Sequence, residues 1–398
     1  MAHTAACPFD YSEQLEFDPS LAQLMARGPV SRIRLSYGEA EAWLVTTFDG
    51  VRQVTTDPRF SRAAIVGRDY PRMTPEPIVS PESINVMDPP RGTRLRHAAA
   101  RAFTQSSVKR MTPAIEEVAH RLVDEMVEHG PPADLARGLS EPLPNHTICA
   151  LLNVPDEDRP LMLRLTQQML ATAPDARQAA AEAKQHLRAY FTTLVAERRK
   201  DGGSDLITTM AAGDQGEEPL SDDELAVLAL TLILSGNDTA TCQISNIAYT
   251  LLTRPELHDL LRRSPEQLPR LLDELLRHIP FRKGVGIPRV ALEDVELEGV
   301  LIRAGEFVHV SYLAANRDPE VFADPEVLDV DRSSHPHMTF GWGGHHCVAS
   351  TLALAELRTA IGVLFTRLPR LRLAVPAQDV PWDTQTIRRF PLELPVTW

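Results

Sequence analysis

Apolar residues recur at helical spacing through most of the chain, and this pattern predicts a mainly helical fold. Between residues 108 and 126 they lie three or four positions apart, as on a helix that buries one face. Residues 176–190 are rich in Ala and Arg, which favour helices. By the same reasoning we expect further helices at 137–152, 156–172 and 177–200.

One predicted helix is apolar on nearly every side. Ser221 is followed three residues later by Glu224, which is the spacing of a capping box at a helix start. The helix can continue to Arg254, because a proline follows. Residues 225–234 are nearly all apolar, so the helix is expected to lie buried at the centre of the fold. Polar residues at 235–239 interrupt this pattern.

Alternation with a period of two is confined to short segments. Residues 31–46 predict a hairpin, and residues 295–297 and 307–312 predict strands of a small sheet. Residues 394–398 are expected to close a final hairpin whose tip lies near 387–390. These patterns predict a mainly α fold with a minor β region, and 398 residues suffice for one large domain or two ordinary ones.

A glycine-rich segment near the C-terminus carries a single cysteine. Phe340, Gly341, Gly343, His345 and Cys347 follow the pattern F-G-x-G-x-H-x-C. The glycines allow a tight turn. The helix predicted directly after the cysteine would direct its positive end at the sulfur and favour a thiolate. A rigid loop of this kind would hold a thiolate in a fixed direction.

Two other interpretations of this segment are possible in principle. A single cysteine is most often a small buried apolar residue. A His-rich run can also bind zinc, and the run here comprises His335, His337, His345, His346 and Cys347. Zinc ligands usually come in closely spaced pairs, and no second pair lies nearby.

Three further motifs lie upstream of the cysteine. They are D-P-P-R-G-T-R-L-R at 88–96, S-G-N-D-T at 235–239 and E-L-L-R at 274–277. An acid and a hydroxyl inside an apolar helix suit proton transfer, although they could also be hydrogen-bonded oddities of a core helix. The E-x-x-R pair could be an ordinary ion pair one helical turn apart.

With these motifs in this order, the chain from about residue 30 to the end resembles the cytochromes P450, which argues against zinc. The resemblance implies a single domain over 1–398, with an N-terminal extension at 1–30. It implies that segments 61–90 and 160–190 cover the substrate pocket. It also implies haem b (iron protoporphyrin IX) as cofactor, with thiolate ligation that favours O–O cleavage.

The resemblance also assigns roles to individual residues. Cys347 is the implied iron ligand, and Asp238 and Thr239 are the implied catalytic pair, which relays protons. The remaining implied haem-binding residues are Arg96, Arg289, Phe340 and His345. Glu274 and Arg277 are implied to brace the cysteine loop, which is a structural role.

Substrate contacts are implied for residues near the centre of the apolar helix and in two loops. These are Leu232, Ser235, Gly284, Val285, Ile287 and Ile387. The chain departs from the family pattern at Gly92, where a histidine is usual, so one donor to the haem propionates is in doubt.

The composition and the N-terminal sequence limit the possible partners and the cellular location. A net charge of −13 argues against nucleic acid as a partner. The N-terminus shows no basic region followed by an apolar run, and no stretch approaches the ~18 apolar residues of a membrane span. The four cysteines show no pairing pattern, which is typical of a reducing compartment. We therefore expect a cytoplasmic protein with no membrane partner.

One segment runs against the acidic balance of the chain. Residues 91–110 hold six Lys or Arg residues and no acid. A solvated helix face is one interpretation. The resemblance implies another, which is a docking face for an acidic ferredoxin supplied with electrons by ferredoxin reductase.

The same resemblance bears on the reaction. Residues 277–291, 311–322 and 394–398 are similar to P450s that couple phenolic polyketides or tryptophan-containing cyclodipeptides. We therefore predict oxidative coupling of an aromatic secondary metabolite, a natural product, with O₂ as oxidant. Hydroxylation or epoxidation of a macrolide or terpenoid is the alternative, and a non-catalytic haem sensor is the alternative of another class.

Overall fold

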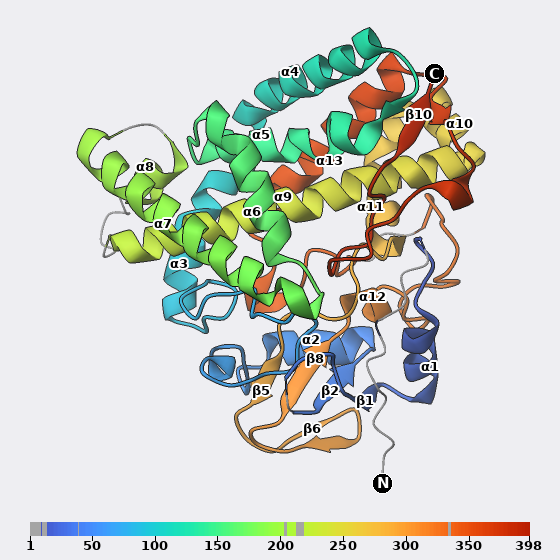
Figure 1. The fold of residues 1–398 in the computed structure, drawn as a ribbon. Helices are drawn as coiled ribbons and strands as arrows, with labels where there is room; N and C mark the ends of the chain where they lie inside the picture. Colours follow the sequence, from blue (N-terminus) through green and yellow to red (C-terminus); the bar gives the residue numbers. More distant parts are fainter. Residues whose placement is uncertain (1–8, 10–13, 39, 203–204, 212–218, 333–335) are drawn as a thin grey trace.

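The computed structural model describes residues 9, 14–38, 40–202, 205–211, 219–332 and 336–398, and it is mainly helical with a minor β region, as predicted (Figure 1). The helices are α1 (Pro19–Arg27), α2 (Phe48–Thr56), α3 (Arg91–Ala100), α4 (Gln105–His129), α5 (Pro142–Leu151), α6 (Arg159–Met169), α7 (Arg177–Asp201), α8 (Leu206–Ala211), α9 (Asp222–Thr253), α10 (Pro255–Arg263), α11 (Leu268–His278), α12 (Tyr312–Ala315) and α13 (Ser350–Arg367). The strands are β1 (Val30–Ile33), β2 (Ala42–Val45), β3 (Phe60–Ser61), β4 (Ala133–Asp134), β5 (Arg289–Ala291), β6 (Val295–Leu297), β7 (Val300–Ile302), β8 (Phe307–Val310), β9 (Arg372–Leu373) and β10 (Pro395–Thr397).

Helix α9 crosses the centre of the helical part of the molecule (Figure 1). The capping box of Ser221 and Glu224 forms as predicted, and the helix ends at Thr253, just before the proline. It packs against α5, α7 and α13. By length and composition it could cross a membrane, but 83% of its apolar window is buried inside the molecule, as in the core helix of a soluble protein.

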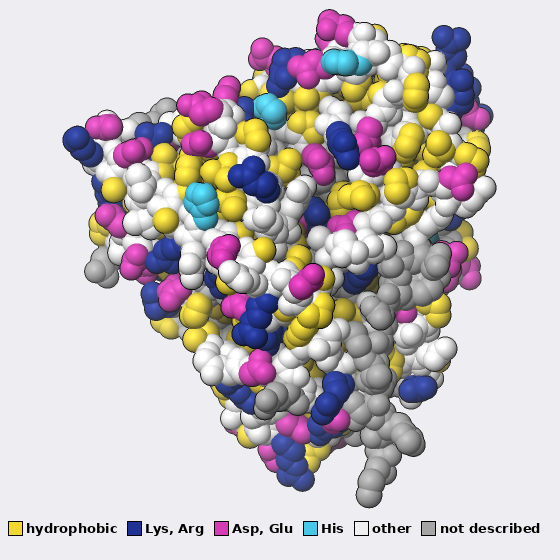
Figure 2. Space-filling view, viewed as in Figure 1, with side chains coloured by type: hydrophobic (Ala, Val, Ile, Leu, Met, Phe, Trp, Pro, Cys, Tyr) yellow, Lys and Arg dark blue, Asp and Glu magenta, His cyan; other side chains and the backbone are white. Residues whose placement is uncertain are grey.

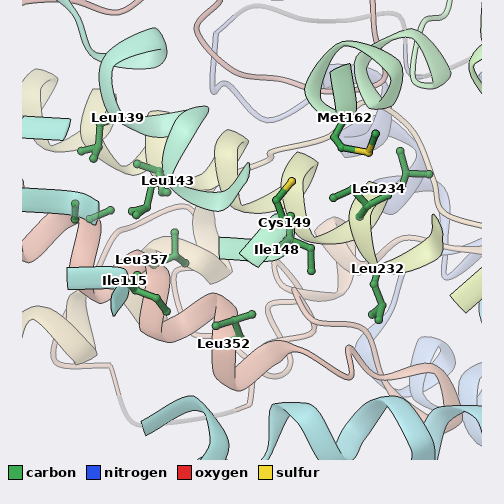
Figure 3. Packing of buried hydrophobic residues seen from close by; sticks show 14 of the residues in the cluster. Ile115, Leu139, Leu143, Ile148, Cys149, Met162, Leu232, Leu234, Leu352 and Leu357 are labelled. Atoms are coloured by element: carbon green, nitrogen blue, oxygen red, sulfur yellow. The ribbon is translucent and has the colours of Figure 1, made fainter. Parts of the chain in front are cut away.

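The interruption of α9 lies against α5. A Cβ added at Gly236 would lie 3.0 Å from the side chain of Ile148 on α5, so a larger residue would require Ile148 to shift. Leu232 and Leu234 leave α9 on opposite sides, and Leu234 points toward Met162 of α6 (Figure 3). The polar stretch therefore remains helical and is packed closely on one side.

The main sheet joins distant parts of the chain. Its strand order is β1-β2-β8-β5-β3, in which β2 and β8 are parallel and the other pairs antiparallel. The predicted hairpin at 31–46 is β1 paired with β2. The strand predicted at 307–312 ends at Val310, because Ser311 instead caps α12 through a 3.2 Å hydrogen bond from the Ala314 N–H.

The C-terminal segment differs from the predicted hairpin. Strand β10 pairs with β9 and β4, and a separate narrow loop is closed by an isolated bridge between Trp382 and Pro391. Near its tip, the Ile387 N–H donates to the Leu170 carbonyl (3.3 Å), and the Ile387 carbonyl accepts from the Lys283 N–H (2.7 Å). This loop thus lies between the end of α6 and the segment that follows α11.

Charges of both signs cover the outside. On the face shown in Figure 2, Lys and Arg side chains are interspersed with Asp and Glu. The motifs singled out in the sequence lie on α3, α9 and α11 and in the loop that precedes α13.

Candidate active site

The cysteine loop is held by its own backbone and by α2. The Cys347 N–H donates to the Phe340 carbonyl, and the Gly341 N–H donates to the Met338 carbonyl, each at 2.8 Å. Gly343 has a φ of +67°, and a Cβ there would lie 2.3 Å from the Thr55 carbonyl oxygen at the end of α2. Only glycine fits this contact, and the loop is therefore fixed against α2.

The surroundings of the Cys347 sulfur both oppose and favour a thiolate. Burial raises the pKa of the thiol, whereas a hydrogen bond from the Ala349 N–H and the nearby Arg96 guanidinium lower it. Burial is the largest of these effects, so the pKa of the thiol lies above its usual value. Helix α13 begins at Ser350, as the sequence predicted for a helix directed at this cysteine.

Glu274 and Arg277 form a buried ion pair on α11. Arg277 Nε and Nη2 donate to the two carboxylate oxygens of Glu274 at 2.8 and 2.7 Å. Arg332 adds a second cation, with Nε 3.3 Å from Glu274 Oε1. Bidentate geometry of this kind gives a strong and oriented interaction.

This ion pair is connected to the cysteine loop through Asn316. Arg277 Nη1 donates to the Asn316 carbonyl at 2.9 Å. The Asn316 side chain accepts from the Met338 N–H at 2.6 Å and donates to Thr339 Oγ1 at 3.0 Å. A continuous chain of hydrogen bonds thus joins the ion pair of α11 to Met338 and Thr339, at the start of the cysteine loop.

A group of cations lies beside the loop. Arg289, on β5, is 1% exposed, and its Nη1 and Nη2 have no hydrogen-bond partner among the described residues. His345 Nδ1 likewise has none. Burial, followed by the charges of Arg62, Arg289 and Arg96, lowers the pKa of His345 to about 2. Buried guanidinium groups without partners fit an anionic ligand, such as the carboxylates of haem.

Arg96 and Gly92 lie on α3 beside this group. Arg96 donates a hydrogen bond to the His346 carbonyl, and burial lowers the pKa of its guanidinium. A Cβ at Gly92 would lie 2.6 Å from the Met87 carbonyl oxygen, so this position is filled by backbone. Arg62 is the member of the group that the sequence did not reveal, since an arginine after a short strand resembles many surface arginines.

The polar residues of α9 divide into a buried acid and an accessible edge. Asp238 is buried, and its two oxygens lie 3.2 Å from Arg388 Nη1 and 3.5 Å from Arg282 Nη2. Thr239 Oγ1 donates to the Ser235 carbonyl at 2.9 Å. Ser235 is exposed although it follows a run of buried residues, so the helix opens onto accessible space there.

The implied substrate contacts fall into two groups. Leu232 and Ile387 belong to the main helical core. Val285 and Ile287 pack instead against the cluster between the N-terminal segment and the main sheet. Gly284 has a φ of +73°, and a Cβ there would meet Met73 at 2.8 Å. Backbone pairing of 281–283 with 387–389 joins the two groups.

Within 9, 14–38, 40–202, 205–211, 219–332 and 336–398, no three His, Cys, Asp or Glu side chains form a group that could hold a metal ion. His335, from the His-rich run, lies outside the described residues, as does most of the 1–13 part of the N-terminal extension.

The chain belongs to the cytochrome P450 family, because the sequence model of that family matches residues 28–386. It is therefore a haem-thiolate enzyme of the monooxygenase class, which leaves the sensor interpretation without support. The unpartnered Arg289 and His345 atoms and the braced cysteine loop fit the haem of this family.

Several characterised proteins are similar to the chain. Nocardicin C N-oxygenase of Nocardia uniformis subsp. tsuyamanensis is 42% identical over 99% of both chains. Biflaviolin synthase CYP158A1 of Streptomyces coelicolor is 42% identical over 96% of this chain and 93% of its own. A solved structure, cytochrome P450mel 107F1 with biaryl coupling reactivity, has 57% identity and a TM-score of 0.98 over 100% of both chains.

Proposed function

We propose that this P450 oxidatively couples an aromatic secondary metabolite, forming a C–C or C–heteroatom bond with O₂ and ferredoxin-derived electrons. Phenolic polyketides and tryptophan-containing cyclodipeptides are the substrate classes. The observation that carries the proposal is the 57% identity, over the full length of both chains, to a P450 with biaryl coupling reactivity. The similarity to biflaviolin synthase supports it.

Cys347 is proposed to supply the thiolate that binds the haem iron. When bound, haem supplies the oxidising chemistry of the enzyme. Arg96, Arg289 and His345 are proposed to bind its propionates, and Phe340 to pack beside the cysteine. Glu274 and Arg277 hold the loop through Asn316, as their hydrogen bonds support.

Asp238 and Thr239 are proposed to deliver protons. The Thr239 hydroxyl lies at the accessible edge of α9. It can break its hydrogen bond to the Ser235 carbonyl and donate to another acceptor instead. Arg388 and Arg282 hold the Asp238 carboxylate, which must leave at least one of them to reach solvent and relay a proton.

Spectroscopy tests the metal ligand. Cys347→Ala should abolish the red-shifted Soret band of the reduced carbon monoxide complex, while Cys149→Ala, at a buried cysteine of α5, should retain it. Purified protein that contains zinc and no haem would contradict the assignment.

Product mass tests the reaction. Coupling removes two hydrogen atoms and inserts no oxygen, so a dimer or adduct lighter by two hydrogens is expected from aromatic substrates supplied with ferredoxin, its reductase and NAD(P)H. A screen for spectral shifts with natural products identifies which substrates to test. A clean gain of one oxygen on an aliphatic macrolide, with no shift from aromatic ligands, would overturn the proposal.

Oxygen insertion is the second candidate function. The paired Asp238 and Thr239 favour it, because insertion requires proton delivery and full O–O cleavage, whereas coupling inserts no oxygen. Mycinamicin IV hydroxylase/epoxidase of Micromonospora griseorubida is 41% identical over 100% of this chain and 99% of its own. Hydroxylation or epoxidation of a macrolide or terpenoid is therefore the alternative.

The redox partner is proposed to dock on the basic segment at 91–110. Part of this segment is used internally, since Arg94 pairs with Glu224 of α9 at 2.6 Å. Lys109 and Arg110, at the start of α4, are exposed and fit an acidic ferredoxin. With this partner, we propose a cytoplasmic location.

Segments 61–90 and 160–190 are proposed to cover the pocket of one P450 domain that spans the chain. Two contacts support their cooperation. Lys184 Nζ on α7 lies 3.3 Å from the carbonyls of both Pro77 and Val79. Tyr37, whose backbone pairs with Arg72 of the 61–90 segment, donates from Oη to the Thr172 carbonyl just after α6 at 2.7 Å.

A further inference from the structure

Arg62 and Arg289 lie at the same end of a strand pair at the edge of the main sheet. Strand β3 pairs with β5 in antiparallel register, with Phe60 opposite Ala291 and Ser61 opposite Val290. Arg62 directly follows the last residue of β3, and Arg289 is the first residue of β5. Like charges that lie close together on neighbouring strands are destabilising. The pairing therefore concentrates positive charge at one point.

The backbone of Arg62 is fixed by Asp88. One Asp88 oxygen accepts from the Arg62 N–H at 3.1 Å, and the other accepts from the Ser61 hydroxyl. No ion pair joins Asp88 to the Arg62 guanidinium among the described residues. The carboxylate thus holds the strand end in place and leaves the guanidinium charge free to meet another anion.

The Arg62 guanidinium is buried and only partly satisfied. Its Nη1 donates to the Asn85 carbonyl at 3.0 Å, and its Nε has no hydrogen-bond partner among the described residues. Burial, followed by the charge of Arg289, lowers its pKa to about 9. Two neighbouring buried guanidinium groups whose nitrogen atoms lack partners favour a shared anion.

Position 92 cannot supply a donor to such an anion. Gly92 is buried, and the Met87 carbonyl occupies the space that its side chain would need. Met87 precedes Asp88, so the same stretch of backbone that excludes a side chain at 92 also fixes Arg62. The backbone at Met87 and Asp88 thus both excludes a donor side chain at position 92 and fixes the position of Arg62.

We propose that Arg62 binds a haem propionate together with Arg289 and is a haem-retaining residue of this enzyme. The proposal rests on the haem cofactor of the family and adds to the set formed by Arg96, Arg289 and His345. The two propionates supply the anions that the guanidinium groups of Arg62 and Arg289 lack. A charged hydrogen bond of about 1.5–3 kcal/mol corresponds to about a 10- to 100-fold effect on haem dissociation.

The test is haem transfer from the purified holoenzyme to excess apomyoglobin. Arg62→Gln should release haem about 10- to 100-fold faster than the native protein, and Arg289→Gln serves as the positive reference. Arg62→Lys, which keeps the charge, should restore part of the retention. The midpoint potential of Arg62→Gln should also become more negative, since a cation beside the cofactor is lost.

Arg68→Gln is the matched control, because Arg68 is an exposed arginine on the same segment. It should release haem at the native rate. Equal rates for Arg62→Gln and Arg68→Gln would overturn the inference. Unchanged retention with lost substrate binding would also overturn it, by assigning Arg62 to the substrate. Either result leaves the Cys347 assignment and the proposed function intact. Absence of haem from the native protein would instead contradict that assignment and the proposed function.

Discussion

At the scale of single residues, the Thr239 hydroxyl can be removed with little disturbance. Its one hydrogen bond among the described residues goes to the Ser235 carbonyl of its own helix, at 2.9 Å. Thr239→Ala should fold normally and raise the peroxide released per electron consumed, because proton delivery is misdirected. The measurement is peroxide against NAD(P)H oxidised. Thr241→Ala, at a buried threonine of the same helix, should keep the native ratio.

A second residue governs how stability depends on pH. Glu356 is buried on α13, and burial raises the pKa of its carboxyl to about 8, although a hydrogen bond with Thr147 acts in the other direction. Between pH 4.5 and 8 the folded state keeps this proton while the unfolded state releases it, so stability falls as pH rises through this window.

Glu356→Gln removes that dependence. The stability of the variant relative to the native protein should increase by about 3 kcal/mol between pH 5 and pH 8, and thermal unfolding at both pH values measures it. Glu117→Gln, at an exposed glutamate of α4, should show no such change. A constant difference between Glu356→Gln and the native protein would contradict the argument.

At the scale of elements, α11 and the cysteine loop act as one unit. Arg277→Met leaves the buried Glu274 carboxylate without its bidentate partner and breaks the link to Asn316. We expect a loss of about 3–5 kcal/mol in unfolding free energy. The double variant Glu274→Gln/Arg277→Met should be less destabilised than the sum of the single variants, because no uncompensated charge is left. Strict additivity in denaturant unfolding would count against this coupling.

The elements were predictable where one local rule determines them. Helix α9 begins at its capping box and ends before its proline, and α13 follows the cysteine as expected. Arg62, Arg388 and Asn316 could not be found in this way, because their roles depend on partners far away in the chain. The strand β3 that places Arg62 has only two residues, and its pairing with β5 leaves no periodic signal.

At the scale of the whole molecule, charge distribution governs the encounter with an electron donor. The chain is acidic, with a net charge of −13, so an acidic ferredoxin must meet it at a local basic surface. Lys109→Glu/Arg110→Glu should raise the KM for ferredoxin about tenfold at low salt and less at high salt. Turnover at saturating ferredoxin should not change.

Arg263→Glu, at an exposed arginine of α10, is the control for this docking surface. It should leave the KM unchanged, although it also makes the protein more acidic. Equal effects from both changes would show that net charge governs the encounter, and the surface at Lys109 and Arg110 would then have no special part.

The parallel pairing of β2 with β8 joins residues 42–45 to residues 307–310, and the cysteine loop lies later still. During synthesis, β2 therefore cannot pair with β8 until most of the polypeptide has left the ribosome. Any truncation before Phe307 removes β8 and leaves the main sheet incomplete, and any truncation before Cys347 removes the sulfur that is proposed to bind the haem iron. Acquisition of haem thus reports that translation has passed Cys347, and products that stop before it should remain colourless.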